Sequence, residues 1–274
     1  MSHSYASVVD TRTLTGRLRR IVLHVDDPDA LAVRPDADSA VGVYFSPGDH
    51  PDGEGRNYSV RHQDGALLTV DIALHREGPG SSWAKTATPG HRVILDHARA
   101  WYHPPAAARW QLLVTDLSGL PAAARIIEEL PSVTGNVEGA IVIAEVPTAD
   151  DLAYLPRREG VTVLPYLGTG NGLGPSVLAD AVRAVSMPPG RGYCWFAGEA
   201  AESRAVRKYL RSLGWQRDDY DITGYWRVDS ERWDARFEEA GDEALIVYER
   251  ALAAGKDEKV AFEEFDEVCE RIGL

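Results

Sequence analysis

The sequence predicts an all-β domain, then an α/β domain with a parallel sheet, then a helical tail. Before about residue 105, short β-like runs alternate with turns rich in Gly, Pro, Asp and Asn. From residue 110, apolar strands alternate with helical segments, a pattern typical of a parallel sheet. The last stretch is acidic and helical in pattern. The expected domains are residues 1–105, 106–228 and 229–274.

Five runs predict the strands of the first domain, and together they favour an antiparallel sheet or a small barrel. The turn-rich segment "PGDHPDGEGRN" separates two of them. All eight histidines lie before residue 104, but no pair has the spacing of a zinc site, so we predict no metal site. The predicted strands are residues 17–25, 41–46, 58–63, 66–75 and 91–98.

The second domain is predicted to alternate strands and helices, with helices on both faces of a parallel sheet. Pro121 stands in the first turn of the first helix, where its missing N–H costs nothing. Ligands of such sheets bind beyond the carboxyl ends of the strands, which here carry Asp116, Glu145, Tyr166 and Gly198–Glu199. The predicted strands are 110–116, 139–146, 161–167, 193–199 and 222–228, and the helices are 121–130, 176–185 and 201–214. The tail is predicted to form two helices separated by "AAGKDE".

Composition excludes several classes of protein. The 274 residues carry a net charge of −13, which disfavours nucleic acid and anionic membranes as partners. No run approaches the roughly 18 apolar residues of a spanning helix. The first residues lack an apolar core of signal-peptide length, so a cytoplasmic location is expected. The two cysteines, Cys194 and Cys269, are too few to hold an iron–sulfur cluster on protein thiolates.

Two short stretches of the first domain suggest a nucleotide cofactor. "RNYS" offers a cation (Arg56), an aromatic face (Tyr58) and a hydroxyl (Ser59), although alone it is more typical of the ordinary start of a strand. "GPGSS" precedes a helix for which Ser81 or Ser82 could be the N-cap, and such a helix start suits a phosphate. A flavin dinucleotide requires all of these features together.

Five stretches then show a family resemblance that runs along nearly the whole chain. The sequence resembles the siderophore-interacting proteins, which are FAD-containing ferric-siderophore reductases related to ferredoxin–NADP reductases. The resemblance implies a flavin-binding β-barrel followed by an α/β nicotinamide domain. The matching stretches are "RNYS", "LHREGPGSSWA", "DLSGLPAAARIIEELP", "WFAGEAAESRAVRKYL" and "GYWR".

The resemblance also implies roles for single residues. Arg56 should face the FAD pyrophosphate, Tyr58 should stack on the isoalloxazine ring, and Ser59 should approach its N5 edge. Trp226 should cover part of the flavin or nicotinamide pocket, unless it is a packed aromatic at a strand end. The expected FAD site comprises Arg56, Asn57, Tyr58, Ser59, Ile72, His75, Gly78, Gly80, Ser81, Ser82, Trp83 and Trp226.

The sequence departs from the family pattern in two places. Leu117 replaces the family's Glu where the nicotinamide would approach, and Gly80 replaces an Ala in the Gly-Pro-Ala-Ser turn. The donor signal is mixed, because Glu145 would favour NADH while Arg204, Arg207 and Lys208 would favour NADPH, and both sets could simply be solvated. The expected NAD(P)H site comprises Thr115, Asp116, Ser118, Glu145, Gly198, Glu199, Arg204 and Arg207.

The function that the resemblance implies is an FAD-dependent reductase that takes electrons from NADH or NADPH and reduces Fe(III) held by a siderophore. Many ferric chelates are anionic, so Arg61 and Arg227 are the predicted substrate contacts. Two alternatives stay open: a less specific flavin reductase or diaphorase, and a non-catalytic siderophore binder, which the Leu117 departure suggests.

Overall fold

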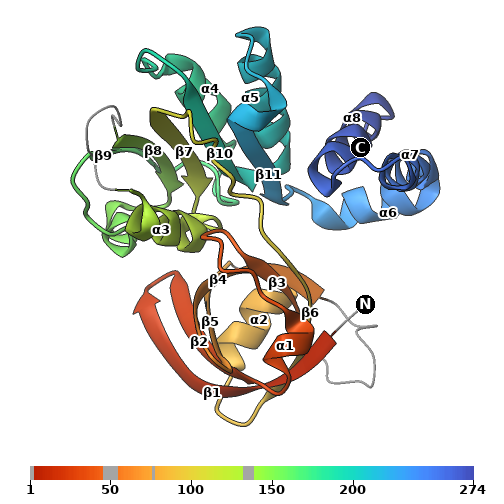
Figure 1. The fold of residues 1–274 in the computed structure, drawn as a ribbon. Coiled ribbons are helices and arrows are strands. Elements are labelled where there is room, and N and C mark those ends of the chain that lie inside the picture. The colour runs from red at the N-terminus through yellow and green to blue at the C-terminus, as the bar shows by residue number, and fades with distance from the viewer. Residues whose placement is uncertain (1–2, 46–54, 76–77, 132–138) are drawn as a thin grey trace. The chain divides into compact units, whose positions relative to one another are not determined.

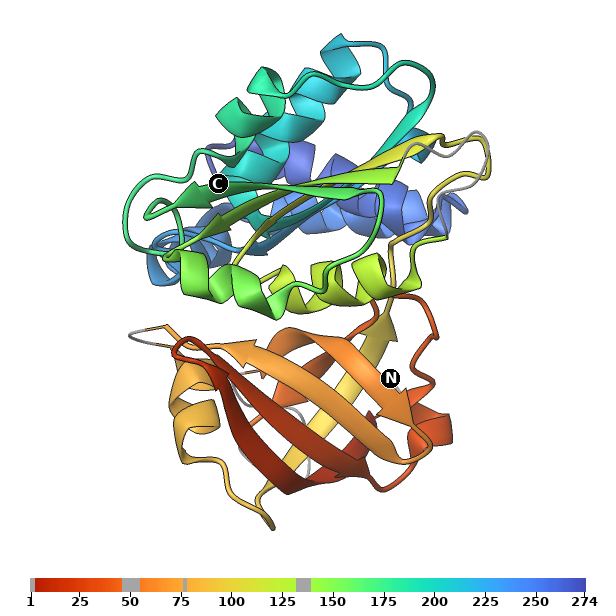
Figure 2. The same ribbon diagram turned by 90° about the vertical axis from the view of Figure 1, so that its left-hand side faces the viewer.

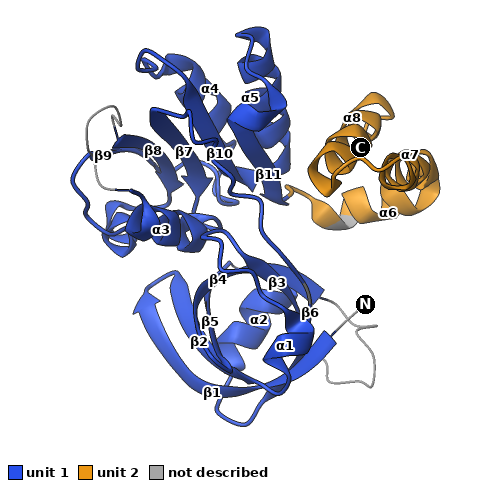
Figure 3. Ribbon diagram, in the orientation of Figure 1, with its two compact units in different colours: residues 1–226 blue, residues 227–274 orange. Residues whose placement is uncertain are grey.

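The computed structural model describes residues 3–45, 55–75, 78–131 and 139–274. The chain forms two compact units, residues 1–226 and residues 227–274 (Figure 3). The expected division of the larger unit at residue 105 and the expected start of the tail at residue 229 stay predictions. Among the described residues, no helix is long and apolar enough to cross a membrane.

The first part of the larger unit is a closed antiparallel barrel (Figures 1 and 2). Its described strands are hydrogen-bonded in the order β1-β2-β5-β4-β3-β6, which confirms the predicted barrel. Residues at alternating positions, such as Leu23, Val41 and Val70, fill its core and are fully buried. The strands are β1 (His3–Thr15), β2 (Leu18–Val25), β3 (Ala40–Tyr44), β4 (Gly55–Asp64), β5 (Leu67–Ala73) and β6 (Arg92–Arg99).

Strand β1 is the barrel element that the sequence did not predict. Burial alternates along its first residues, but the inward positions carry Ser4, Ala6 and Val8. Two of these three side chains are small, so the apolar alternation that marks a strand is weak. The residues from Val9 onward lie mostly toward solvent and add no apolar pattern.

Helix α2 (Pro79–Thr86) follows β5 and begins earlier than expected. Gly78 is its N-cap with a φ of 120°, a conformation that favours glycine. Pro79 then fits the first helical position, where no N–H partner is needed. The prediction that Ser81 or Ser82 caps this helix is therefore wrong, since both lie inside it. The other helix of this part, α1 (Pro28–Leu31), is one short turn.

The second part of the larger unit is a parallel sheet with the strand order β11-β10-β7-β8-β9 in the described residues. Helix α3 covers one face and helices α4 and α5 cover the other, as predicted (Figure 1). Leu113 and Trp195 point toward α3, whereas Leu112 and Phe196 point to the opposite core. The strands are β7 (Trp110–Asp116), β8 (Gly139–Val146), β9 (Val161–Leu167), β10 (Gly192–Glu199) and β11 (Tyr220–Trp226). The helices are α3 (Leu120–Glu129), α4 (Leu178–Ala184) and α5 (Ala200–Ser212), with short 3-10 turns at Ala149–Tyr154 (η1) and Arg217–Asp219 (η2).

The strand order reverses between β7 and β10, and this reversal positions the site. The chain passes from β7 outward to β8 and β9, then returns to β10 and β11 on the other side of β7. In open α/β sheets the ligand crevice lies at such a switch point, outside the carboxyl ends of the strands. These ends carry Asp116 on β7 and Gly198–Glu199 on β10.

Polar contacts join the barrel to the sheet part within the larger unit. Arg20 on β2 pairs with Asp71 on β5 at 2.6 Å, and the Tyr154 hydroxyl of η1 also donates to Asp71. Arg17 pairs with Asp151 at 3.2 Å. Helix α3 lies in the layer between barrel and sheet (Figure 2). The Asp71 side chain has no exposed surface, so the carboxylate is buried. Removing Arg20 would leave this buried charge without its partner and would destabilise the fold.

The smaller unit contains the helices α6 (Ser230–Ala240), α7 (Asp242–Ala253) and α8 (Glu258–Arg271) in the described residues. The sequence predicted two helices separated by "AAGKDE", and the break between α7 and α8 lies at that segment. The extra break falls at Gly241. This position has no room for a side chain, since a Cβ there would lie 2.5 Å from the carbonyl oxygen of Phe237. The Trp233 and Phe237 rings stack at 4.8 Å beside the small core of this unit.

Candidate functional site

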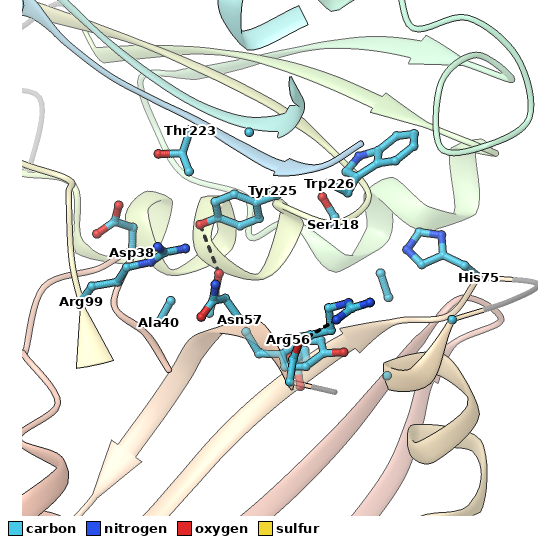
Figure 4. Close-up of a pocket in the computed structure, with 18 of the residues that line it drawn as sticks. Asp38, Ala40, Arg56, Asn57, His75, Arg99, Ser118, Thr223, Tyr225 and Trp226 are labelled. Atoms are coloured by element: carbon cyan, nitrogen blue, oxygen red, sulfur yellow. Dashed lines mark hydrogen bonds between the residues drawn. The ribbon is translucent and has the colours of Figure 1, made fainter. Parts of the chain in front are cut away.

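A cavity of about 320 Å³ lies in the larger unit, between the barrel and the carboxyl ends of the sheet (Figure 4). Strand β4 and the start of α2 form one wall, and the end of β11 with Ser118 forms the opposite wall. This volume falls in the usual range for a small-molecule or cofactor site. Its position also coincides with the topological switch point of the sheet.

Strand β4 presents Arg56, Tyr58 and Ser59 to this cavity. Arg56 is exposed, and its Nη1 donates to the neighbouring carbonyl of Gly55 at 2.8 Å. Ser59 is buried, and its hydroxyl lies 3.3 Å from the hydroxyl of Tyr225 on β11. A cation and a hydroxyl therefore stand close together on β4, and Tyr225 on β11 brings a second hydroxyl beside that of Ser59.

Tyr58 is packed against the start of α2. A Cβ placed on Gly80 would lie 1.7 Å from the Tyr58 hydroxyl oxygen, so this contact exists only because residue 80 is glycine. The Phe45 ring meets the Tyr58 ring edge-on at 6.2 Å and the Trp83 ring at 5.1 Å. Burial raises the pKa of Tyr58 well above its usual value, so the phenol stays neutral.

His75, which follows β5, is held by side chains of α2. The Ser81 hydroxyl accepts from the His75 backbone N–H at 2.8 Å, and the Lys85 ammonium donates to the His75 carbonyl at 3.0 Å. Burial, followed by the charge of Lys85, lowers the pKa of His75, so this imidazole is neutral at pH 7. His75 and the start of α2 thus bring a neutral ring and a helix N-terminus to the cavity wall.

The opposite wall is organised by Asp116 at the end of β7. Its Oδ1 accepts from the Ser118 N–H at 2.8 Å and from the Ser118 hydroxyl at 2.5 Å. Its Oδ2 accepts from the Trp226 indole N–H at 2.5 Å. Burial raises the pKa of Asp116 to about 6, against the opposing effect of these hydrogen bonds. Asp116 itself is fully buried, while Ser118 and Trp226 line the cavity.

Several lining residues were not anticipated from the sequence. Asp38 lies in the loop before β3, Arg99 ends β6, Trp101 follows it, and Thr223 and Tyr225 belong to β11. Buried Asp38 accepts from the Trp101 backbone N–H at 2.9 Å and from the Trp195 indole at 3.2 Å. The pairing of β3 with β6 and the packing of the barrel on the sheet bring these residues together. Short sequence motifs indicate neither the strand pairing nor the packing.

Most of the predicted flavin residues do line this cavity. Three do not. Ile72 is 1% exposed and belongs to the barrel core, Ser82 is exposed on α2, and Trp83 packs on Phe45. The structure brings together Arg56, Asn57, Tyr58, Ser59, His75, Gly78, Gly80, Ser81 and Trp226.

The predicted nicotinamide residues are less well gathered. Glu145 is fully buried, and its carboxylate accepts from the hydroxyls of Thr169 and Ser176 and from the Val177 N–H, which does not fit a contact with a ribose. Arg207 is buried and donates to the Ile222 carbonyl at 3.2 Å, which does not fit a contact with a 2′-phosphate.

The remaining residues of this set lie at or near the carboxyl end of the sheet. Thr115 is buried, and its hydroxyl donates to the carbonyl of Asp116 at 2.9 Å. Glu199 caps α5 and accepts from the Ala201 N–H at 2.6 Å. Arg204 is half-buried on α5, and Gly198 is the penultimate residue of β10. Leu117 is 1% exposed and packs in the core, so this position offers no polar group.

Of the two predicted substrate arginines, Arg61 belongs to the larger unit and is not among the residues that line the cavity. Arg61 forms a bidentate pair with Glu128 on α3, with distances of 2.7 and 2.5 Å. Arg227 belongs to the smaller unit, where its guanidinium lies 4.0 Å from the centre of the Trp233 ring. The expected contact of these two arginines with a substrate stays a prediction.

A barrel followed by a five-stranded parallel sheet defines a ferredoxin-reductase-like fold, and the comparison with solved structures agrees. The ferredoxin NADP⁺ reductase of Neisseria gonorrhoeae aligns over 82% of this chain and 100% of its own, with a TM-score of 0.58 and 15% identity. A siderophore-interacting protein of Acinetobacter baumannii aligns over 89% and 99%, with a TM-score of 0.73 and 22% identity. A siderophore utilization protein from T. fusca aligns over 83% and 93%, with a TM-score of 0.69 and 30% identity.

The chain belongs to the siderophore-interacting protein family. The profile of the siderophore-interacting FAD-binding domain matches residues 46–100, and the siderophore-interacting protein profile matches residues 108–229. The NADPH-dependent ferric-chelate reductase of Escherichia coli is 30% identical over 75% of this chain and 78% of its own length.

Two further relatives match shorter segments. The ferric vibriobactin reductase of Vibrio cholerae is 29% identical over 63% of this chain. An uncharacterized protein of Mycobacterium tuberculosis is 34% identical over the same share of this chain. Each of these two matches spans 64% of the relative's own length.

Proposed function

We propose that this protein is an FAD-dependent reductase that uses electrons from NADH or NADPH to reduce Fe(III) held by a siderophore, and so releases the iron. The observation that carries the proposal is the cavity at the switch point, which gathers Arg56, Tyr58 and Ser59 opposite Trp226. Relatives named as ferric reductases support the reaction class.

The residues present fit FAD. Gly80 has no Cβ, so the Tyr58 ring can lie in close contact with the start of α2. Tyr58 thereby forms part of the cavity wall. Arg56 is exposed beside it and supplies a fork of donors suited to a pyrophosphate. The start of α2 adds backbone N–H groups at the positive end of a helix dipole.

Each wall of the cavity has a role in this proposal. Arg56 and the segment Gly78–Ser81 hold the pyrophosphate, and Tyr58 supplies the stacking face. The hydroxyls of Ser59 and Tyr225, 3.3 Å apart, are placed to hydrogen-bond the polar edge of the ring. When bound, FAD supplies a centre that accepts two electrons from a nicotinamide and passes them on singly.

The donor is proposed to approach from the sheet side of the cavity. Asp116 holds the Trp226 indole and the Ser118 hydroxyl in fixed positions there, so these two groups form the wall that a nicotinamide meets. Gly198 and Glu199 at the end of β10, with Arg204 on α5, remain the proposed contacts for the rest of the donor. Siderophores bind Fe(III) through hard oxygen ligands far more tightly than Fe(II), so reduction of the iron weakens its hold.

The proposal is tested by separating cofactor binding from the two electron-transfer steps. The purified protein should be yellow or bind added FAD, and should release FAD rather than FMN on denaturation. Under anaerobic conditions NADH or NADPH should bleach the bound flavin, and a ferric siderophore should restore its colour. A flavin that neither donor bleaches would favour the non-catalytic binder, and equal rates with ferricyanide and ferric siderophores would favour a general diaphorase.

A further inference from the structure

A guanidinium and an indole form a pair on the cavity wall, outside the five sequence stretches that carry the family resemblance. Arg99 is the last residue of β6, and Trp101 follows two residues later. The guanidinium carbon of Arg99 lies 4.5 Å from the centre of the Trp101 ring, and both residues line the cavity. A cation held over an indole face at this distance is attracted to it and restricted in its motion.

The register of the barrel places this pair beside the ring-binding part of the cavity. Arg99 is paired with Ala40 on β3, and Ala40 is paired in turn with Ser59 on β4. Arg99 and Ser59 therefore lie two strands apart, roughly 10 Å between their Cα atoms. The Arg99 side chain extends from the end of β6 toward Tyr225, whose hydroxyl is bonded to Ser59 (Figure 4).

Arg99 forms no ion pair with the described residues. Among the described residues, no carboxylate oxygen lies within 4.0 Å of its guanidinium nitrogens. Asp38 is the neighbouring acid of the cavity, but its oxygens accept from the Trp101 N–H and the Trp195 indole. Arg56, the other arginine of the cavity lining, stands on β4 near the start of α2.

We infer that Arg99 contacts the pyrimidine end of the flavin ring and stabilises the negative charge that this ring gains on reduction, while Arg56 serves the pyrophosphate. The inference rests on the proposed function. A guanidinium has only donors, so it suits the end of the ring that carries carbonyl oxygens and a ring nitrogen, not the dimethylbenzene end. Tyr58, Arg56 and Gly78–Ser81 would then hold the remainder of the cofactor.

The test measures how strongly the protein prefers reduced over oxidised FAD. The variant is Arg99→Gln, and the control is Arg183→Gln, which removes an exposed arginine that pairs with Asp180 on the surface of α4. Each protein is loaded with FAD, its affinity for oxidised FAD is titrated, and the midpoint potential of the bound flavin is measured against a reference dye under anaerobic conditions.

We expect Arg99→Gln to bind oxidised FAD within about threefold of wild type but to lose roughly 10- to 100-fold of the preference for the reduced form, the usual worth of a charge-assisted hydrogen bond. For a two-electron couple this corresponds to a potential about 30–60 mV more negative. Arg99→Lys should recover part of the shift, because it restores the charge without the planar fork. If Arg99→Gln does not fold, Trp101→Leu, which frees the guanidinium, should shift the potential in the same direction.

An unchanged potential in folded, FAD-loaded Arg99→Gln would overturn the inference and leave the proposed function standing. Equal losses of affinity for oxidised and reduced FAD would also overturn it, since Arg99 would then be a simple binding contact. So would a raised KM for a ferric chelate at unchanged potential, because Arg99 would then face the substrate. A wild-type protein that binds no FAD would instead refute the proposed function itself.

Discussion

Replacing Gly80 by Ala tests how closely Tyr58 is packed against the start of α2. The added Cβ would lie 1.7 Å from the Tyr58 hydroxyl oxygen and 3.0 Å from Cζ, whereas ordinary contacts begin at 3.4 Å. The hydroxyl must therefore withdraw by about 1.7 Å, the difference between the first and last of these distances. Because it is the far end of a rotatable side chain, we expect the ring to swing away while the helix stays in place.

This swing sets the expected magnitude. Leaving its rotamer and weakening its edge contact with Phe45 each cost Tyr58 about 0.5–1.5 kcal/mol. Alanine in the helix offsets roughly 0.5–1 kcal/mol of that cost. The free energy of unfolding of the apoprotein should therefore fall by only about 1 kcal/mol. The affinity for FAD should fall about 10-fold, equivalent to about 1.4 kcal/mol, because the stacking face is displaced.

The assay is a double-mutant cycle with Tyr58→Phe, which removes the atom that the new methyl group meets first. FAD is titrated into the four apoproteins, and their unfolding in urea is followed in parallel. Gly80→Ala should cost less FAD affinity in the Tyr58→Phe background than in wild type. If the two substitutions are additive within about 0.5 kcal/mol, Tyr58 does not lie against residue 80 and the reasoning fails.

Three further substitutions test other parts of the account. Arg20→Ala should lower the free energy of unfolding by about 3 kcal/mol because it leaves Asp71 buried without its ion pair, whereas exposed Arg183→Ala should cost less than about 0.5 kcal/mol; equal losses in urea unfolding would contradict this. Burial raises the pKa of Asp116 to about 6, so the folded state binds its proton more tightly than the unfolded state. The stability of wild type relative to Asp116→Asn should therefore rise by on the order of 3 kcal/mol as pH falls from about 7 to about 4, and a difference that does not change with pH would refute it. Arg56→Ala should weaken FAD binding by about 10- to 100-fold, with partial recovery in Arg56→Lys, and unchanged affinity in folded protein would remove Arg56 from the site.

The sequence predicted the sheet part most closely, and the reason is physical. Strands β7 and β10 are buried along their whole length, so each is a continuous run of mainly apolar or small residues that turns bound clearly. The predicted bounds of β8 and β9 coincide with those in the structure. Strand β1 escaped prediction because small residues fill most of its inward positions.

The cavity wall formed by β4 and the start of α2 was also predictable, because its residues lie close together in two short motifs. The opposite end of the cavity could not be predicted from the sequence. Asp38, Arg99 and Trp101 come from a loop and a strand end that only the closure of the barrel brings near Ser59. No spacing along the chain encodes that proximity.

Helical spacing alone misled the donor prediction. Arg204 and Arg207 are three residues apart, which puts them on neighbouring positions of α5 but does not say which position faces the sheet. Arg207 proves to be 4% exposed and bonded to the Ile222 carbonyl. Ile72 illustrates the same limit in the barrel, because alternation along β5 turns its side chain into the core beside residues that line the cavity.

The most direct test of the central claim is anaerobic electron transfer from the FAD-loaded protein to a panel of ferric chelates. The flavin is first reduced with NADH or NADPH, the chelate is added, and Fe(II) is captured by a coloured Fe(II) ligand while the flavin spectrum is recorded. The account predicts that ferric siderophores reoxidise the flavin and yield two Fe(II) per FAD, faster than ferricyanide is reduced. A loaded protein whose reduced flavin stays reduced in the presence of every ferric siderophore, with no Fe(II) formed, would contradict it.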